Sequence, residues 1–182
     1  MAGGDISPLA SGARLIAAAP AQVLFEPFAR PLLLAHAVVG FAALGSATHL
    51  AAYALLAARR GRGVAQLRRF SLLSPVALAA QALLGLALYP TYRVRVRLED
   101  LERTAPAVVQ LFDFKEHLAA LAVALILAAA ASARALCRPD GGPRPQSARW
   151  AVAALSASGA ALTWIAALIG LYVTARHPVG TP

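Results

Sequence analysis

Long apolar stretches alternate with short charged segments along the chain. Four runs contain no Asp, Glu, Lys or Arg, at 31–58, 70–92, 117–133 and 150–175, and they are 28, 23, 17 and 26 residues long. A helix rises about 1.5 Å per residue and a bilayer core is about 30 Å thick, so roughly 20 apolar residues are enough to cross it. The pattern predicts four transmembrane helices, and only the third run is short.

The composition supports the same class of protein. Of the 182 residues, 59% are hydrophobic and 14% are charged, whereas soluble domains carry roughly a quarter charged residues. We therefore expect an all-α fold, a four-helix transmembrane bundle with short loops and an outer-face interfacial segment. The lipid bilayer is the partner that this class requires, and a membrane protein partner or a homo-oligomer is compatible with it.

The predicted segments follow the chain in order. They are an outer interfacial segment at 1–30, transmembrane helices at 31–58, 70–92, 114–135 and 150–175, a loop at 59–69, an outer loop with a helix start at 93–113, a second loop at 136–149 and a tail at 176–182. Thr104 and Pro106 are a helix start signal, so the third span is expected to begin outside the membrane.

Arginine is concentrated on one side of the predicted membrane. The connections between spans one and two and between spans three and four carry nine basic residues and one acid, while the opposite side carries eight basic residues and seven acids. Short arginine-rich loops resist translocation, so the first side is predicted to be cytoplasmic. With four spans, both termini then lie outside the cytoplasm, and a plasma (inner) membrane location is expected.

Other classes have little support in the sequence. The net charge of +9 would suggest nucleic-acid binding in a soluble chain, but too little sequence lies outside the spans to fold a basic domain. The one cysteine, Cys137, permits no internal disulfide. No phosphate-binding loop, zinc-protease motif or serine-hydrolase motif occurs, so the chain is not expected to be an enzyme on its own.

Small residues predict the packing face of the fourth span. In lipid, helices associate through close contacts between small side chains and through interhelical hydrogen bonds. One stripe at spacings of three and four consists of Ser156, Ala160, Thr163, Ala167, Gly170 and Thr174. We expect this stripe to face other helices, and one hypothesis is a cofactor-free accessory or structural subunit whose stripes dock onto a larger membrane complex. In span two, the buried amide of Gln81 needs a partner inside the bundle.

Histidine is the candidate ligand type for a redox site. His36 lies about 9 Å inside the membrane from Arg30, by the helical rise, and an ionisable residue at that depth suggests function. His49 lies thirteen residues further on, about 220° round the helix, so the two imidazoles face different ways and a two-haem arrangement is excluded. His117 begins the third span on the same side of the membrane as His36.

A b-type haem between His36 and His117 is therefore the sharpest functional hypothesis, as a small electron-transfer protein. Gly40 leaves room for a flat macrocycle, and Asp113 is placed to accept the second ring N–H of His117. The segment after span two carries Arg93, Arg95 and Arg97 at alternate positions. If this segment is extended, the three guanidinium groups lie on one side and can bind haem propionates.

Several alternatives use the same residues. If the membrane boundary is drawn at Arg30 and Glu116, His36 lies about 9 Å deep and His117 only about 1.5 Å deep. The two imidazoles then differ in depth by roughly 7 Å, which counts against a shared haem. His36 and His117, with Asp113 and Glu116, offer ligands for a divalent metal ion. A membrane histidine often only bonds to a neighbouring helix, and the arginines can pair with nearby acids. A proton or metal-ion carrier would use a polar path through His36, Gln81, Asp113 and Glu116.

Overall fold

The computed structural model describes residues 23–137 and 145–176, and everything regular in them is helical. The elements are a 3-10 helix η1 (Glu26–Phe28), α1 (Ala29–Arg60), α2 (Val64–Thr91), a π-helix η2 (Tyr92–Leu101), α3 (Glu102–Thr104), α4 (Pro106–Leu136) and α5 (Gln146–Arg176). Four helical segments are long and apolar enough to cross a membrane. The all-α four-helix architecture is confirmed. Most of the predicted interfacial segment, the middle of the second loop and the tail lie outside the described residues.

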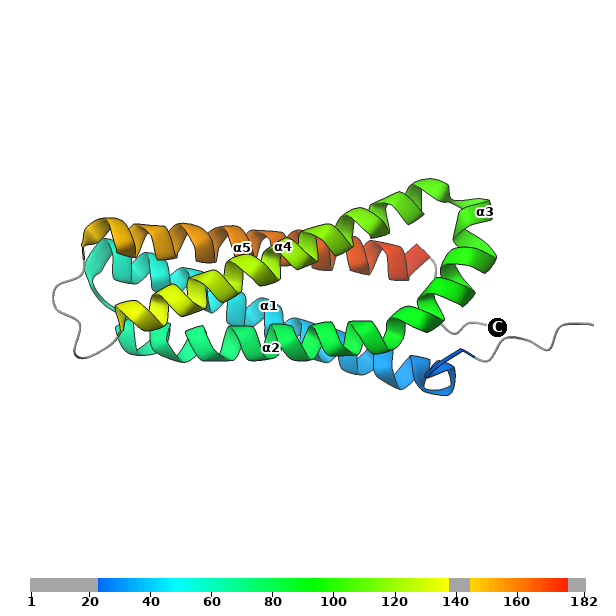
Figure 1. The fold of residues 1–182 in the computed structure, drawn as a ribbon, viewed down its shortest axis with the longest axis horizontal. Coiled ribbons are helices and arrows are strands. Elements are labelled where there is room, and N and C mark those ends of the chain that lie inside the picture. The colour runs from blue at the N-terminus through cyan, green and yellow to red at the C-terminus, as the bar shows by residue number, and fades with distance from the viewer. Residues whose placement is uncertain (1–22, 138–144, 177–182) are drawn as a thin grey trace, which may run out of the picture.

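The four long helices run along the long axis of the molecule (Figure 1). α1 packs most closely against α2, and α4 against α5, while α2 and α4 have much the smallest contact of the four main helix pairs. α1 and α4 run in the same direction, as the colour gradient in Figure 1 shows. His36 and His117 therefore belong to the same half of the bundle, as expected.

Two different connections close the two ends of the bundle. At one end, called here the loop end, only residues 61–63 separate α1 from α2. Gly61 and Gly63 have φ angles of +63° and +80°, a left-handed conformation that glycine adopts without strain. The predicted loop 59–69 is therefore much shorter in the structure, and Arg68 and Arg69 lie in the first turns of α2.

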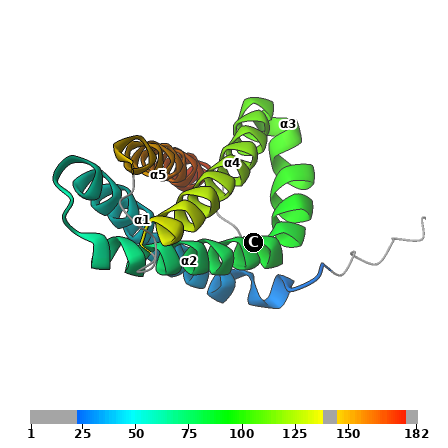
Figure 2. The same ribbon diagram turned by 60° about the vertical axis from the view of Figure 1, so that its left-hand side comes forward.

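At the other end, η2 and α3 form a helical arch from α2 to α4, seen in both Figure 1 and Figure 2. The prediction of a loop at 93–113 is wrong in this respect, because the segment is helical apart from Ala105. The buried side chains of Tyr92, Val96 and Leu101 hold the arch against α4 and α5. α4 begins at Pro106 as expected, but Thr104 bonds back to Asp100 and does not cap the helix.

An alanine core fills the loop-end half of the bundle. It comprises Ala43, Ala47, Leu50, Ala54, Ala57, Ala58, Leu67, Leu78, Ile126, Ala129, Ala133, Val152, Ala153 and Ala160. Small side chains let helix backbones approach closely, which is the main source of association between helices in lipid. The stripe on α5 contributes to this packing, since Ser156 and Ala160 are buried inside the bundle.

A second, smaller apolar cluster lies at the arch end. It consists of Tyr92, Val96, Leu101, Val109 and Val173. Between the two apolar clusters, each of the four long helices has a stretch that belongs to neither cluster. The polar side chains described below lie in this region.

We predict that Gly159 is indispensable to the alanine core. A Cβ at this position would lie 2.8 Å from Ile126 Cδ1 and 3.3 Å from its backbone nitrogen. Gly159→Ala should therefore lower the free energy of unfolding in mixed detergent micelles by about 1–3 kcal/mol, a typical overpacking cost. Gly45→Ala is the matched control, because nothing lies within 4 Å of its Cβ position. Equal stability of the two variants would contradict this account of the α4–α5 contact.

Candidate intramembrane polar site

His36 and Gln81 form a hydrogen-bonded pair between α1 and α2. The two Nε2 atoms are 2.8 Å apart. An amide nitrogen can only donate, so Gln81 donates to His36, and the proton of the neutral imidazole then resides on Nδ1. This bond satisfies the expectation that Gln81 needs a partner inside the bundle.

The pair leaves two buried polar atoms unused. Among the described residues, His36 Nδ1 and Gln81 Oε1 have no hydrogen-bond partner. One is a donor and the other an acceptor in this tautomer. A buried polar group without a partner costs roughly 1–3 kcal/mol, so each such atom in a native fold calls for an explanation such as bound water or a ligand.

Glycines on neighbouring helices make room for the polar side chains. A Cβ at Gly40 of α1 would lie 3.1 Å from the Gln81 amide nitrogen, and one at Gly85 of α2 would lie 3.2 Å from His36 Cε1. Each glycine is one helical turn beyond the polar residue of its own helix. On α5, Gly170 faces the methylene chain of Lys115 at 3.8 Å in the same way. Three helices therefore provide a glycine against which a polar side chain from another helix lies.

Lys115 and Glu116 bring two charged groups to this region from α4. The Lys115 ammonium lies 4.5 Å from the centre of the Phe112 ring, and its charge acts on both His36 and Glu116. Burial of charge in a membrane is expensive unless it is paired or faces a polar cavity. We call His36, Gln81, Lys115 and Glu116 the intramembrane site.

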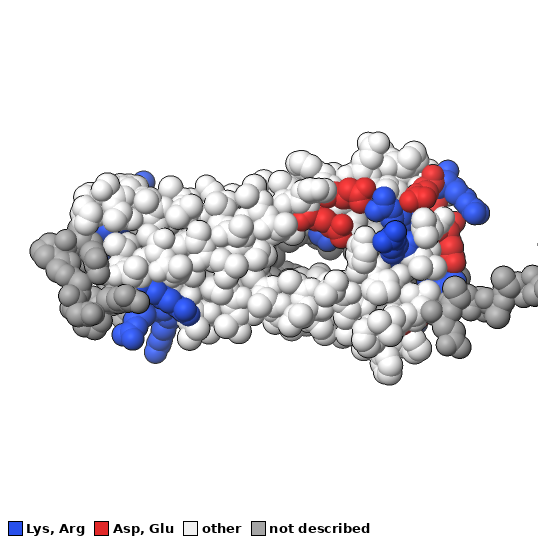
Figure 3. Space-filling model, in the orientation of Figure 1, with Lys and Arg blue, Asp and Glu red and all other residues white. Residues whose placement is uncertain are grey.

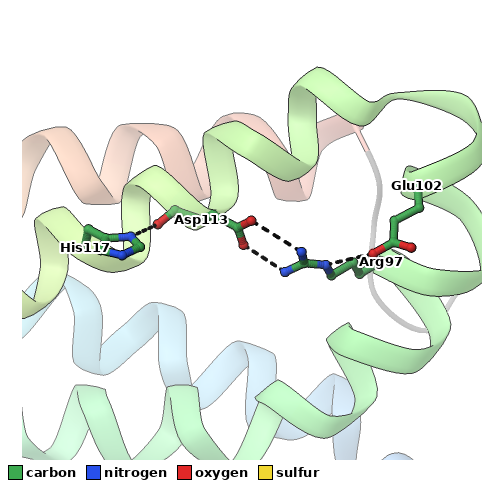
Figure 4. Close-up of polar contacts among 4 residues, drawn as sticks. All are labelled: Arg97, Glu102, Asp113 and His117. Atoms are coloured by element: carbon green, nitrogen blue, oxygen red, sulfur yellow. Dashed lines mark hydrogen bonds and ion pairs between the residues drawn. The ribbon is translucent and has the colours of Figure 1, made fainter.

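Ion pairs continue from this site to the arch. Arg97 Nη1 lies 2.8 Å from Asp113 Oδ1, and Arg97 Nε lies 3.1 Å from Glu102 Oε1 (Figure 4). Arg95 pairs with Glu26 at 2.7 Å and with Glu99 at 2.8 Å. The side chains are about one quarter to one half exposed, so each pair contributes little to stability alone, but together they link the arch, α4 and η1.

Figure 3 shows an opening through the molecule beside the charged side chains near the arch. It lies in the half of the bundle where α2 and α4 diverge (Figure 1). Towards the loop end, the alanine core closes the bundle. Its buried polar side chains are serines, and no buried side chain in this half is ionisable within the described residues.

His117 does not point into the intramembrane site. Its side chain is exposed, and its Nδ1 donates to the backbone carbonyl of Asp113 at 2.7 Å (Figure 4). The Asp113 carboxylate was expected to accept this proton, but it binds Arg97 instead. The carbonyl one turn earlier is the nearest acceptor for a histidine on a lipid-facing helix, which explains the difference.

Two other features of the haem hypothesis differ in the structure. The space beside Gly40 is taken by the Gln81 amide. Arg93, Arg95 and Arg97 lie on the π-helix η2 and are not extended; Arg95 and Arg97 are engaged by acids, and Arg93 is exposed. In the structure, Arg95 and Arg97 thus pair with nearby acids, which is the ordinary alternative to binding haem propionates.

Metal ligation has no geometric support in the part of the chain that the structure describes. No three His, Cys, Asp or Glu side chains gather there as a metal-binding group. His49 bonds to the Gly45 carbonyl at 2.7 Å and stacks on Phe70 with ring centres 4.9 Å apart, so its ring is engaged in local packing.

Comparison with protein-family models, with curated proteins and with solved structures finds no match for this chain.

Lys115 is the residue of this site that the sequence did not single out as a candidate. It is the single lysine of a chain that has 16 arginines, and it lies next to the short third run. That contrast was a usable signal, because lysine has a flexible apolar stem that can carry its charge along a neighbouring helix.

We predict energetic coupling between His36 and Gln81. His36→Phe and Gln81→Leu each leave the partner side chain without its bond, whereas the double variant removes both polar groups. Measured as unfolding free energies in detergent, the double variant should be less destabilised than the sum of the singles by about 0.6 kcal/mol, and at most about 1.7 kcal/mol.

The matched control pairs Gln81→Leu with His49→Phe. His49 bonds to its own helix, so these two changes should be additive. Additivity in both cycles would show that the His36–Gln81 bond does not form in the folded protein.

Proposed function

We propose that this is a multi-pass membrane protein that handles protons at the His36–Gln81 pair, reached through a polar path from the arch end. The observation that carries the proposal is the hydrogen bond between His36 and Gln81 across α1 and α2, which leaves His36 Nδ1 and Gln81 Oε1 buried without a partner among the described residues. Ionisable groups at that depth mark proton relays and substrate paths. The sequence offers the same residue types for a proton or metal-ion carrier, with Asp113 and Glu116 continuing the path from His36 and Gln81.

The path has the components of a proton relay. Arg97 joins Glu102 and Asp113 at the arch, and Glu116 follows Asp113 on α4 within one helical turn. Imidazole takes up and releases protons near neutral pH more readily than any other side chain. His36 is therefore the proton-accepting group, and because Gln81 donates to its single acceptor nitrogen, proton uptake requires the Gln81 amide to turn and present Oε1 to the new N–H.

Access is from one side only. Beyond the site, the alanine core contains no buried ionisable side chain among the described residues. A polar path that ends inside the bundle suits a protein that brings protons to a membrane-embedded site. An open channel would need polar groups across the full thickness of the bilayer.

A b-type haem is the second candidate. The opening near the arch (Figure 3) favours it, since a macrocycle needs such a space between helices. It would require His117 to turn inward from the Asp113 carbonyl. The accessory-subunit hypothesis stays a prediction; of its α5 stripe, Ser156 and Ala160 pack inside the bundle and Gly170 faces Lys115.

We predict that water reaches the intramembrane site. In a Cys137→Ala background, Gln81→Cys should react with a charged, membrane-impermeant methanethiosulfonate in liposomes at least roughly tenfold faster than Leu83→Cys, since thiolates form only where water is present. Leu83 is exposed to lipid and lies closer to the arch end. Depth alone would thus favour the control, which makes the comparison stringent.

Glu116→Cys and Phe114→Cys form the same kind of pair on α4, where Phe114 is the lipid-facing member nearer the arch. If Leu83→Cys and Phe114→Cys react faster, the polar path does not exist. In intact cells, the side from which the reagent acts also tests the predicted orientation, in which the arch end is outside the cytoplasm.

The visible spectrum separates the two candidate functions. Protein purified from cells supplied with haem is expected to be colourless if His36 serves protons only. A Soret band that disappears in both His36→Ala and His117→Ala would instead support haem ligation by these two imidazoles. His49→Ala is the control and should leave any such band unchanged.

A further inference from the structure

Arginines gather at the loop end, and the part of the chain that the structure describes places no carboxylate there. The arginines are Arg59, Arg60, Arg62, Arg68, Arg69, Arg134 and Arg149. The described acids all belong to the arch half, and they are Glu26, Glu99, Asp100, Glu102, Asp113 and Glu116. On the face seen in Figure 3, the blue side chains at the loop end have no red side chain beside them. This end therefore carries positive charge that no described acid neutralises.

Arg149 is held over the turn between α1 and α2. The Gln146 amide donates to the Ala58 carbonyl, which fixes the first turn of α5 against the last turn of α1. Arg149 follows one turn later, and its Nη1 lies 3.7 Å from the position that a Cβ would have at Gly61. The Arg149 guanidinium thus lies against a turn in which the residues on both sides of Gly61 are also arginines.

Arg149 also lines a pocket whose other walls are mostly apolar. Ala57 of α1, Val64 and Leu67 of α2 and Leu136 of α4 contribute to it. Arg149 is partly buried, and its side chain has no hydrogen bond or ion pair with another described residue. Because a guanidinium has five N–H donors and a permanent charge, an unpaired one that lines a pocket favours an anion there.

The level of the pocket in the membrane indicates which anion it takes. One uncharged run ends at Ala58 and the next begins at Phe70, so the turn and the start of α2 lie at the level of the lipid head groups. An anionic phospholipid carries its phosphate close to hydrocarbon, which matches a guanidinium beside apolar walls. A free phosphate would gain nothing from those walls, because they offer only apolar surface.

We propose that this pocket binds the head group of an anionic phospholipid, with the phosphate held by Arg149 and the adjoining hydrocarbon against the apolar walls. The other arginines of the loop end attract such lipids to this side of the bilayer. The inference is independent of the proposed function, because the pocket lies at the loop end and the intramembrane site lies beyond the alanine core.

Trp150, which follows Arg149, provides a local reporter. Its side chain is 43% exposed, and in a Trp164→Phe background it is the single tryptophan of the chain. The full-length protein is placed in phosphatidylcholine liposomes that contain a minor fraction of brominated lipid, either phosphatidylglycerol or phosphatidylcholine, with bromine near the head group. The salt concentration is about 1 M, at which the Debye length is about 3 Å and only charges in contact still act strongly.

Stronger quenching of Trp150 by brominated phosphatidylglycerol is expected, since the cation of a choline head group is repelled by the neighbouring arginines. Arg149→Gln should reduce this preference at least about tenfold, the usual effect of one lost charge-assisted hydrogen bond. Arg134→Gln is the matched control, because it removes the same charge from the same end of the bundle. Arg134 is exposed and lies about 200° round α4 from Leu136, so its loss should leave the preference unchanged.

A second pair of variants tests the pocket without changing charge. Val64→Phe fills the pocket and should also weaken the preference for phosphatidylglycerol. Ala65→Phe is its control, because Ala65 is exposed next to Val64 and does not line the pocket.

Three results would overturn the inference. Equal quenching by the two brominated lipids would show that no anionic lipid is preferred at Trp150. Equal losses in Arg149→Gln and Arg134→Gln would show diffuse attraction to a basic surface and no site. Complete loss of the preference in millimolar inorganic phosphate would show that Arg149 takes a free anion and not a lipid.

Discussion

The helical arch between α2 and α4 is the constraint on which the site depends. Residues 92–104 are helical, so the length of the segment that they span is fixed. The burial of Tyr92, Val96 and Leu101 holds this segment in place. The arch therefore keeps the adjoining halves of α2 and α4 apart, while at the other end a turn of three residues holds α1 and α2 together. A bundle with one tight end and one spread end has a closed half and an open half, and the polar side chains lie where the open half begins.

Small residues have different functions in the two halves. In the alanine core they let backbones approach, and Gly159 against Ile126 is the tightest such contact among the glycines of the described residues. In the open half, Gly40, Gly85 and Gly170 each face a polar side chain of another helix. The same residue type thus provides cohesion in one half and space for polar groups in the other, because in lipid both depend on the absence of a Cβ.

Rotation about the helix axis separates His36 from His117, the two ligands of the haem hypothesis. Sequence distances put His36 and His117 in the same half, which the parallel course of α1 and α4 confirms. They did not indicate rotation about the helix axis, and His117 faces outward while Lys115, two residues earlier, faces the bundle. A step of two residues turns a helix by about 200°, so the choice between neighbours decides which chemistry enters the site.

The sequence alone determined the class, the number of helices and their course, because transfer of apolar stretches into lipid is governed by length and composition. It also indicated that Gln81 would need a partner and that the α5 stripe would pack. Only the tertiary structure decided which polar groups meet, since that depends on helix rotation and on the spread imposed by a helical arch where the sequence predicts a loop. Arg97 shows the physical reason: its partners Glu102 and Asp113 come together only because the chain folds back from η2 to α4.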